Sequence, residues 1–109
     1  HPALSDMAGY KANRAGGYPH LFTKFDGMDT PDKLKTLEYY DVVNFAKLIK
    51  VPVFMTWGYN DDVCPPTTSY IVYNVLDTEK EALISPVNEH WISDTTRYHI
   101  MEWIKGKLK

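Results

Sequence analysis

The chain has 109 residues, of which 44% are hydrophobic and 14% aromatic, so it is long enough and apolar enough for one small domain. Its net charge of −2 does not indicate the basic surface that binds nucleic acid, and its charges form no block of one sign. The apolar runs are too short to cross a bilayer, and the single cysteine excludes a disulfide framework within the chain. We therefore expect neither nucleic acid nor a membrane as a partner.

Residues 1–29 are the least regular part of the sequence. The chain begins with His1 and Pro2, without an initiator methionine or a signal peptide, which predicts a processed chain or an internal piece of a longer one. The stretches "AGGYPH" and "DGMDTPD" carry the signals of turns and loops. One short helix is predicted between Leu4 and Arg14, and the rest of this lead-in is expected to be irregular.

Residues 30–50 are predicted to form two amphipathic helices. The run Thr30-Pro31-Asp32 is typical of a helix start, with a capping threonine, a proline at the first helical position and an acid in the first turn. Asp41 is the candidate cap of the second helix. The predicted buried stripes are Leu34, Leu37 and Tyr40 in the first helix and Val42, Phe45, Ala46 and Ile49 in the second.

Residues 51–87 are predicted to form a strand–helix–strand unit. The run "VPVFMTW" is continuously apolar and ends at Gly58, which is typical of a strand buried on both faces; "EALISPV" is a second, weaker strand. The segment "TTSYIVYNVL" between them is rich in β-branched residues, which favour a strand, but it follows two prolines and has helical spacing. We interpret it as a helix. Such a unit is expected to be parallel and right-handed, which makes the fold class α/β.

The last predicted element is a helix over residues 93–108. Ser93 or Asp94 caps its start, and the lysines of its final turn suit the negative end of the helix dipole. Apolar residues recur along it every four positions and predict one buried stripe, formed by Ile100, Ile104 and Leu108.

Acidic and basic side chains follow the two predicted strands. Asp61 and Asp62 come just after the first strand, and His90 comes just after the second. In open parallel sheets, functional sites lie beyond the carboxyl ends of the strands, so neighbouring strands would bring these side chains together. An aspartate beside a histidine fixes the imidazole tautomer and stabilises the imidazolium, as in a hydrolytic triad.

Other interpretations of these residues stay open at this stage. Two adjacent aspartates in a loop are a common turn device, and a single histidine in a loop is more often structural or solvated. Asp61, Asp62 and His90 could also offer ligands to a metal, although their spacing matches no recognised metal motif. Cys64 is disfavoured as a nucleophile because two prolines follow it, where a sharp strand-to-helix elbow would need flanking glycines.

A nucleophilic serine is not predicted within this chain. None of the serines stands in the G-x-S-x-G pattern that such an elbow requires; they are Ser5, Ser69, Ser85 and Ser93. In α/β folds that carry the triad, the chain order is serine, then aspartate, then histidine. The serine is therefore expected upstream of this chain, in a preceding part of the same domain.

The stretch "YYDVVNFAKLIKVPVFMTWGYNDDVCPPTTSYIVYN" resembles the C-terminal part of the acetyl xylan esterase / cephalosporin C deacetylase family, which are serine esterases with the α/β-hydrolase fold. In that family a Tyr-Asp-x-x-Asn-Phe-Ala helix precedes a Gly-x-x-Asp-x-x-Cys-Pro-Pro loop whose aspartate is the catalytic acid. The resemblance is good from Tyr39 to His90, looser in the last helix and weak before Thr30. It implies that Asp61 rather than Asp62 is the catalytic acid, and that His90 is the catalytic base.

The resemblance also implies a function for the chain. It predicts a carbohydrate acetyl esterase that acts on a small acetylated sugar, with no metal or other cofactor and, by family resemblance, in the cytoplasm. We expect residues 1–109 to be inactive alone, because the serine would lie in the missing N-terminal part of the domain, and we expect open strand edges to favour a homo-oligomer. The alternatives are another α/β hydrolase, such as a prolyl-oligopeptidase-like peptidase, or a non-catalytic binding module.

Trp91 departs from the family, where a smaller or acidic residue is expected; it either packs under the last helix or lines the pocket.

Overall fold

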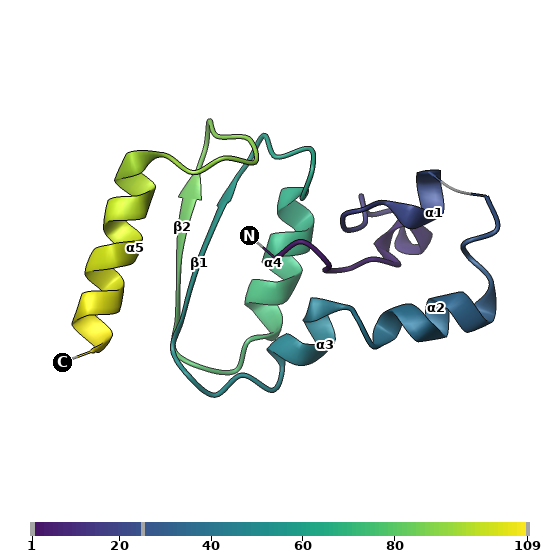
Figure 1. Ribbon diagram of the computed structural model, residues 1–109, viewed down its shortest axis with the longest axis horizontal. Coiled ribbons are helices and arrows are strands. Elements are labelled where there is room, and N and C mark those ends of the chain that lie inside the picture. Colours follow the sequence, from purple (N-terminus) through teal and green to yellow (C-terminus); the bar gives the residue numbers. More distant parts are fainter. Residues whose placement is uncertain (1, 25, 109) are drawn as a thin grey trace.

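The computed structural model describes residues 2–24 and 26–108 (Figure 1). In chain order its elements are the 3₁₀ turn η1 (Gly9–Ala12), α1 (Leu21–Lys24), α2 (Pro31–Glu38), α3 (Val42–Ala46), β1 (Val53–Gly58), α4 (Pro66–Val75), β2 (Lys80–Ser85) and α5 (Asp94–Lys107). None of the described helices is long and apolar enough to span a membrane.

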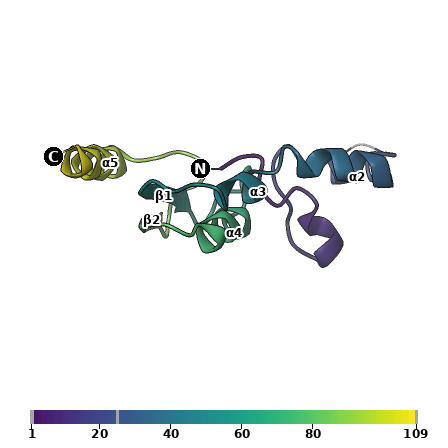
Figure 2. The same ribbon diagram turned by 90° about the horizontal axis from the view of Figure 1, so that it is seen from below.

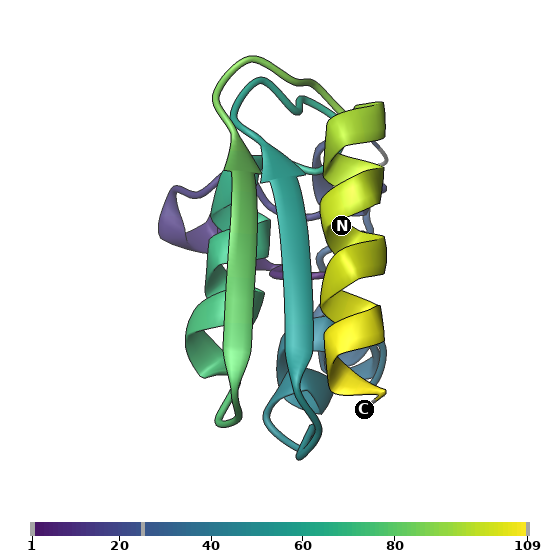
Figure 3. The same ribbon diagram turned by 90° about the vertical axis from the view of Figure 1, so that its left-hand side faces the viewer.

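The two strands form a parallel sheet, as predicted. Val53 pairs with Lys80 at one end of the ladder and Gly58 pairs with Ser85 at the other. Helix α4 connects the strands and covers one face together with α3, whereas α5 lies against the other face beside β1 (Figure 3). The α/β fold class is therefore confirmed.

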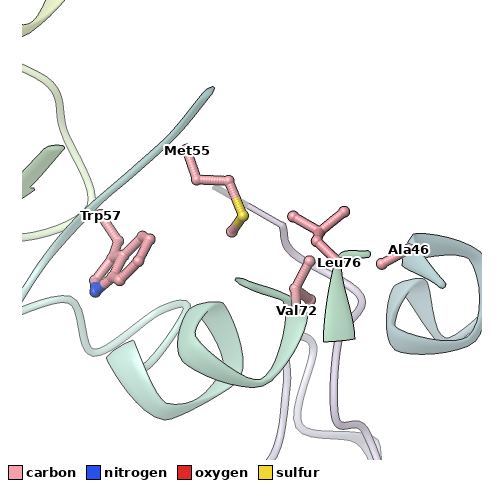
Figure 4. Packing of buried hydrophobic residues seen from close by; sticks show 5 residues of the cluster. All are labelled: Ala46, Met55, Trp57, Val72 and Leu76. Atoms are coloured by element: carbon pink, nitrogen blue, oxygen red, sulfur yellow. The ribbon is translucent and has the colours of Figure 1, made fainter. Parts of the chain in front are cut away.

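The core forms where β1 meets α3 and α4. The strand is buried from Met55 to Gly58, in agreement with its unbroken apolar sequence. Trp57 is 1% exposed, and its ring packs edge-on against Tyr70, with 4.9 Å between the ring centroids. Figure 4 shows the residues of the buried cluster, which are Ala46, Met55, Trp57, Val72 and Leu76.

The ambiguous segment after the two prolines is a helix, as predicted. Pro65 has extended backbone angles just before α4, and Pro66 occupies its first turn, where a missing N–H costs no helical hydrogen bond. Val72 lies in the core, while Thr68 and Ser69 are buried near the start of the helix. The β-branched residues that favoured a strand are tolerated because packing against β1 outweighs their weaker helix propensity.

The short helix predicted between Leu4 and Arg14 forms, but only as the 3₁₀ helix η1 of four residues, Gly9–Ala12. Asp6 and Asn13 have positive φ angles of 53° and 57°, which a helix cannot contain. The Asp6 carboxylate instead accepts two hydrogen bonds of 2.8 Å from the Arg14 guanidinium. This bidentate pair folds the segment back on itself rather than extending it as a helix.

Asp41 caps α3 as predicted, and it also holds the N-terminal segment. Its carboxylate accepts hydrogen bonds from the backbone N–H groups of Val43 at 2.9 Å, Asp6 at 3.1 Å and Met7 at 3.0 Å. One carboxylate therefore satisfies a helix start and a chain segment 34 to 35 residues away.

The apolar stripes of the helices are less buried than predicted. Tyr40 is 63% exposed and Phe45 52%; Ile104 on α5 is 38% exposed, and Leu108, which directly follows α5, is 82% exposed. Figure 2 shows the reason: α2 extends away from the sheet, and no described element lies over the outer side of α5. A sequence stripe predicts that a face is apolar but not which part of a chain covers it.

Trp103 attaches helix α5 to the sheet, and an ion pair between Lys107 and Glu79 adds a second link near the end of the helix. The Trp103 ring lies 5.6 Å from the ring of Phe54 on β1, and its Nε1 donates to Glu81 of β2 at 2.8 Å. The helix begins as predicted, because Ser93 Oγ accepts from the Thr96 N–H at 3.1 Å.

Candidate active site

The loops that follow β1 and β2 lie side by side at the carboxyl end of the sheet (Figures 1 and 3). Backbone carbonyls of the second segment accept hydrogen bonds from the first. The Tyr59 N–H donates to the Ser85 carbonyl at 3.0 Å, the Asn60 N–H to the Asn88 carbonyl at 3.1 Å, and the Asn60 side-chain amide to the Val87 carbonyl at 3.3 Å. These bonds continue the ladder beyond the last strand pair. The two loops are therefore held together as one unit.

Gly58 is what allows the loops to approach so closely. A Cβ at this position would lie 2.1 Å from the Asn88 carbonyl oxygen and 2.6 Å from the Glu89 carbonyl oxygen. Both are backbone atoms that cannot rotate away. Only glycine permits this approach, and it brings the loop of His90 over the end of β1.

Asp61 is almost completely buried, at 3% exposure, and its carboxylate has two sets of partners. Oδ1 accepts hydrogen bonds from the backbone N–H groups of Val63 at 3.0 Å and Cys64 at 2.8 Å. These bonds close a turn of the kind that aspartate favours in loops. The turn interpretation of Asp61 is therefore correct, and it fixes the carboxylate in one orientation.

His90 contacts this fixed carboxylate directly. Its Nδ1 lies 2.9 Å from Oδ2 and 3.1 Å from Oδ1 of Asp61, although the residues are 29 positions apart. The histidine side chain is 48% exposed while the aspartate side chain is 0% exposed. With Nδ1 protonated and donating to the carboxylate, Nε2 carries the lone pair that a general base needs.

The neighbouring residues take other positions. Asp62 is exposed on the loop surface. Cys64 is 1% exposed, and burial followed by the negative charge of Asp61 raises the pKa of its thiol, which disfavours the thiolate that a nucleophile requires. Among the described residues, no group of three or more His, Cys, Asp or Glu side chains could hold a metal ion.

Three of the four serines make hydrogen bonds that stabilise a loop or a helix start. Ser5 Oγ donates to the Pro2 carbonyl, Ser85 Oγ accepts from the Asn88 N–H, and Ser93 caps α5. Ser69 is fully buried in α4.

Sequence reasoning missed the residues that support the pair. Asn88, 6% exposed, joins the two loops, and His20 places its Nε2 3.2 Å from the carbonyl oxygen of Val63 in the Asp61 turn. The asparagine stands two positions before His90, a pattern that could have drawn attention to it. The histidine is 43 positions from Val63, and no sequence signal marks that contact.

Residues 1–107 match the family described as acetyl xylan esterase (AXE1). The acetyl esterase Axe7A of Xylanibacter ruminicola is 62% identical over 109 residues, which are 100% of this chain and 25% of that protein.

Two solved structures share the fold. Acetyl xylan esterase 1 from Thermoanaerobacterium sp. JW/SL YS485 matches with a TM-score of 0.74 and 28% identity, over 91% of this chain and 33% of that one. The acetyl xylan esterase from Paenibacillus sp. R4 matches with a TM-score of 0.78 and 25% identity, over 94% of this chain and 34% of that one. The chain thus spans about a quarter of the curated relative and about a third of the solved structures.

Proposed function

This chain belongs to the acetyl xylan esterase family, and we propose that it supplies the acid and the base of a serine esterase that removes acetyl groups from xylo-oligosaccharides or similar sugars. The observation that carries the proposal is the contact between His90 Nδ1 and the buried Asp61 carboxylate at 2.9 Å. The same contact would also serve a serine peptidase, and the esterase is favoured because the relatives of this chain are named as acetyl or acetyl xylan esterases.

The proposed reaction follows from this geometry. A serine outside residues 1–109 attacks the ester carbonyl while His90 Nε2 takes its proton. The Asp61 carboxylate stabilises the imidazolium that forms, and His90 then passes the proton to the oxygen of the leaving sugar. Water, activated by the same Nε2, releases acetate from the acetyl-serine.

The two backbone hydrogen bonds to Asp61 have a role in this reaction. They fix the carboxylate before the substrate arrives, so no reorganisation is needed when the imidazolium charge develops. His90 is about half exposed, which leaves its ring accessible to a substrate and to a serine from the preceding part of the domain.

A chimera tests this function. The segment of Axe7A that this chain matches is replaced by residues 1–109, and the product is called the Axe7A chimera below. We expect it to hydrolyse 4-nitrophenyl acetate and acetylated xylan, and a fluorophosphonate probe to label one serine outside residues 1–109.

The control is the same chimera with His90→Ala, which should lose both activity and rapid labelling. A well-folded chimera that cleaves neither ester would contradict the proposal and favour the non-catalytic binding module. Labelling of a serine inside residues 1–109 would contradict the proposed division of the triad.

A further inference from the structure

Trp91 directly follows His90, and we propose that its indole ring forms the binding surface for the sugar part of the ester. This inference rests on the proposed esterase function. It names the side chain that selects the alcohol part of the ester substrate.

The three tryptophans of the chain have different surroundings. Trp57 is in the core, and Trp103 packs against Phe54 and donates to Glu81. Trp91 is 57% exposed, and within the described part of the chain its ring makes no aromatic contact. This exposure favours the second of its two expected roles, lining the pocket, over packing under α5. An indole left in water beside a reactive pair is a surface suited to a ligand.

The chemistry of ester cleavage decides which part of the substrate reaches Trp91. His90 must give a proton to the oxygen of the leaving alcohol, so that oxygen lies within about 3 Å of Nε2 in the transition state. The acyl carbon is held instead by the nucleophile and by the donors around the carbonyl oxygen. The Cα atoms of consecutive residues are about 3.8 Å apart, so a side chain next to His90 is within reach of the alcohol.

The loop holds Trp91 in a fixed relation to the base. The side-chain amide of the buried Asn88 donates to the Trp91 carbonyl at 3.5 Å, and the Asn88 N–H donates to Ser85 Oγ at 3.2 Å. These bonds anchor the backbone on both sides of His90. An anchored backbone reduces the entropy that the loop loses when substrate binds.

A pyranose ring is the group that suits this surface. The ring is uncharged and has one face made of C–H groups, which pack on a flat aromatic ring, while its hydroxyls stay in water. Ethyl or methyl alcohols are too small to cover an indole. Trp91 should therefore favour acetyl esters of sugars over acetyl esters of small alcohols, without affecting the choice of acyl group.

The test compares two esters in the Axe7A chimera. Trp91→Ala should lower kcat/KM for acetylated xylo-oligosaccharides about tenfold, which corresponds to about 1.4 kcal/mol. Most of the loss should be in KM, and kcat/KM for ethyl acetate should change by less than about twofold. Trp91→Phe should restore most of the sugar preference because it keeps a flat ring. Preference between ethyl acetate and ethyl butyrate should not change.

Val87→Ala is the matched control, because Val87 is 76% exposed on the same loop, has no aromatic ring, and contacts Asn60 only through its backbone carbonyl, which the substitution keeps. This substitution should leave kcat/KM for both esters unchanged. An equal loss for both esters after Trp91→Ala, with a lower melting temperature, would show that the ring packs against another part of the protein and would overturn the inference. No loss for either ester would overturn it as well. If the unsubstituted chimera cleaves neither ester, the esterase proposal itself fails and this inference fails with it.

Discussion

The substitution Gly58→Ala should disable the site without touching a reacting group. The added Cβ would start 2.1 Å from the Asn88 carbonyl oxygen, whereas carbon–oxygen contacts in proteins are ordinarily about 3.3 Å or longer. The loop of His90 must therefore retreat by roughly 1.2 Å. Its Nδ1, now 2.9 Å from Asp61 Oδ2, would then lie about 4 Å away, beyond hydrogen-bond distance.

A misplacement of about 1 Å costs on the order of 10²-fold in rate. We therefore expect Gly58→Ala in the Axe7A chimera to lower kcat for 4-nitrophenyl acetate about 100-fold or more, while circular dichroism reports a folded protein. Gly106→Ala is the matched control, since a Cβ added to this glycine of α5 would meet no atom of the described residues within 4 Å. It should keep full activity and gain about 0.5–1 kcal/mol of stability. A folded Gly58→Ala chimera with unchanged kcat would refute the role given to this close approach.

Three further predictions concern the chain itself. Cys64 should react with iodoacetamide far more slowly in the native chain than in urea, because burial and then the charge of Asp61 raise its pKa; equal rates would contradict the buried position. The isolated 109 residues should hydrolyse 4-nitrophenyl acetate no faster than free imidazole, and stoichiometric fluorophosphonate labelling of a serine would refute this. In sedimentation at micromolar concentration the isolated chain should associate or be partly unfolded. Its radius of gyration of 15.1 Å exceeds the about 13 Å of a compact domain of this size, and a cooperatively unfolding compact monomer would disprove that expectation.

The sequence predicted the part of the fold that depends on local pattern. The apolar run before Gly58 and the proline pair at the start of α4 were sufficient to predict a parallel strand–helix–strand unit. A buried strand and a helix start both depend on residues that are neighbours in the sequence. The caps Asp41 and Ser93 were found for the same reason. Burial of the helix stripes was overestimated at Tyr40, because a stripe does not reveal whether a covering layer is present.

In the candidate site too, some features could be predicted from the sequence and others could not. Position at the strand ends predicted that Asp61 and His90 would meet, and the family resemblance separated Asp61 from Asp62. The supporting contacts could not be predicted, because they join segments that are far apart in the sequence. Neither the fit of Gly58 against Asn88 nor the contact of His20 with Val63 follows from any local pattern.

The most direct test of the account is the effect of Asp61→Asn and Asp62→Asn, made separately in the Axe7A chimera, on kcat for acetylated xylo-oligosaccharides. The buried Asp61 carboxylate lies 2.9 Å from His90 Nδ1, and replacing an aspartate that orients a catalytic histidine by asparagine costs about 10⁴ in turnover in serine proteases. Asp62 is exposed on the loop surface. We therefore predict that Asp61→Asn lowers kcat by several orders of magnitude and that Asp62→Asn stays within about tenfold of the unsubstituted chimera. The reverse ranking, or equal small effects in two folded variants, would contradict the assignment of Asp61 and His90 as the acid–base pair.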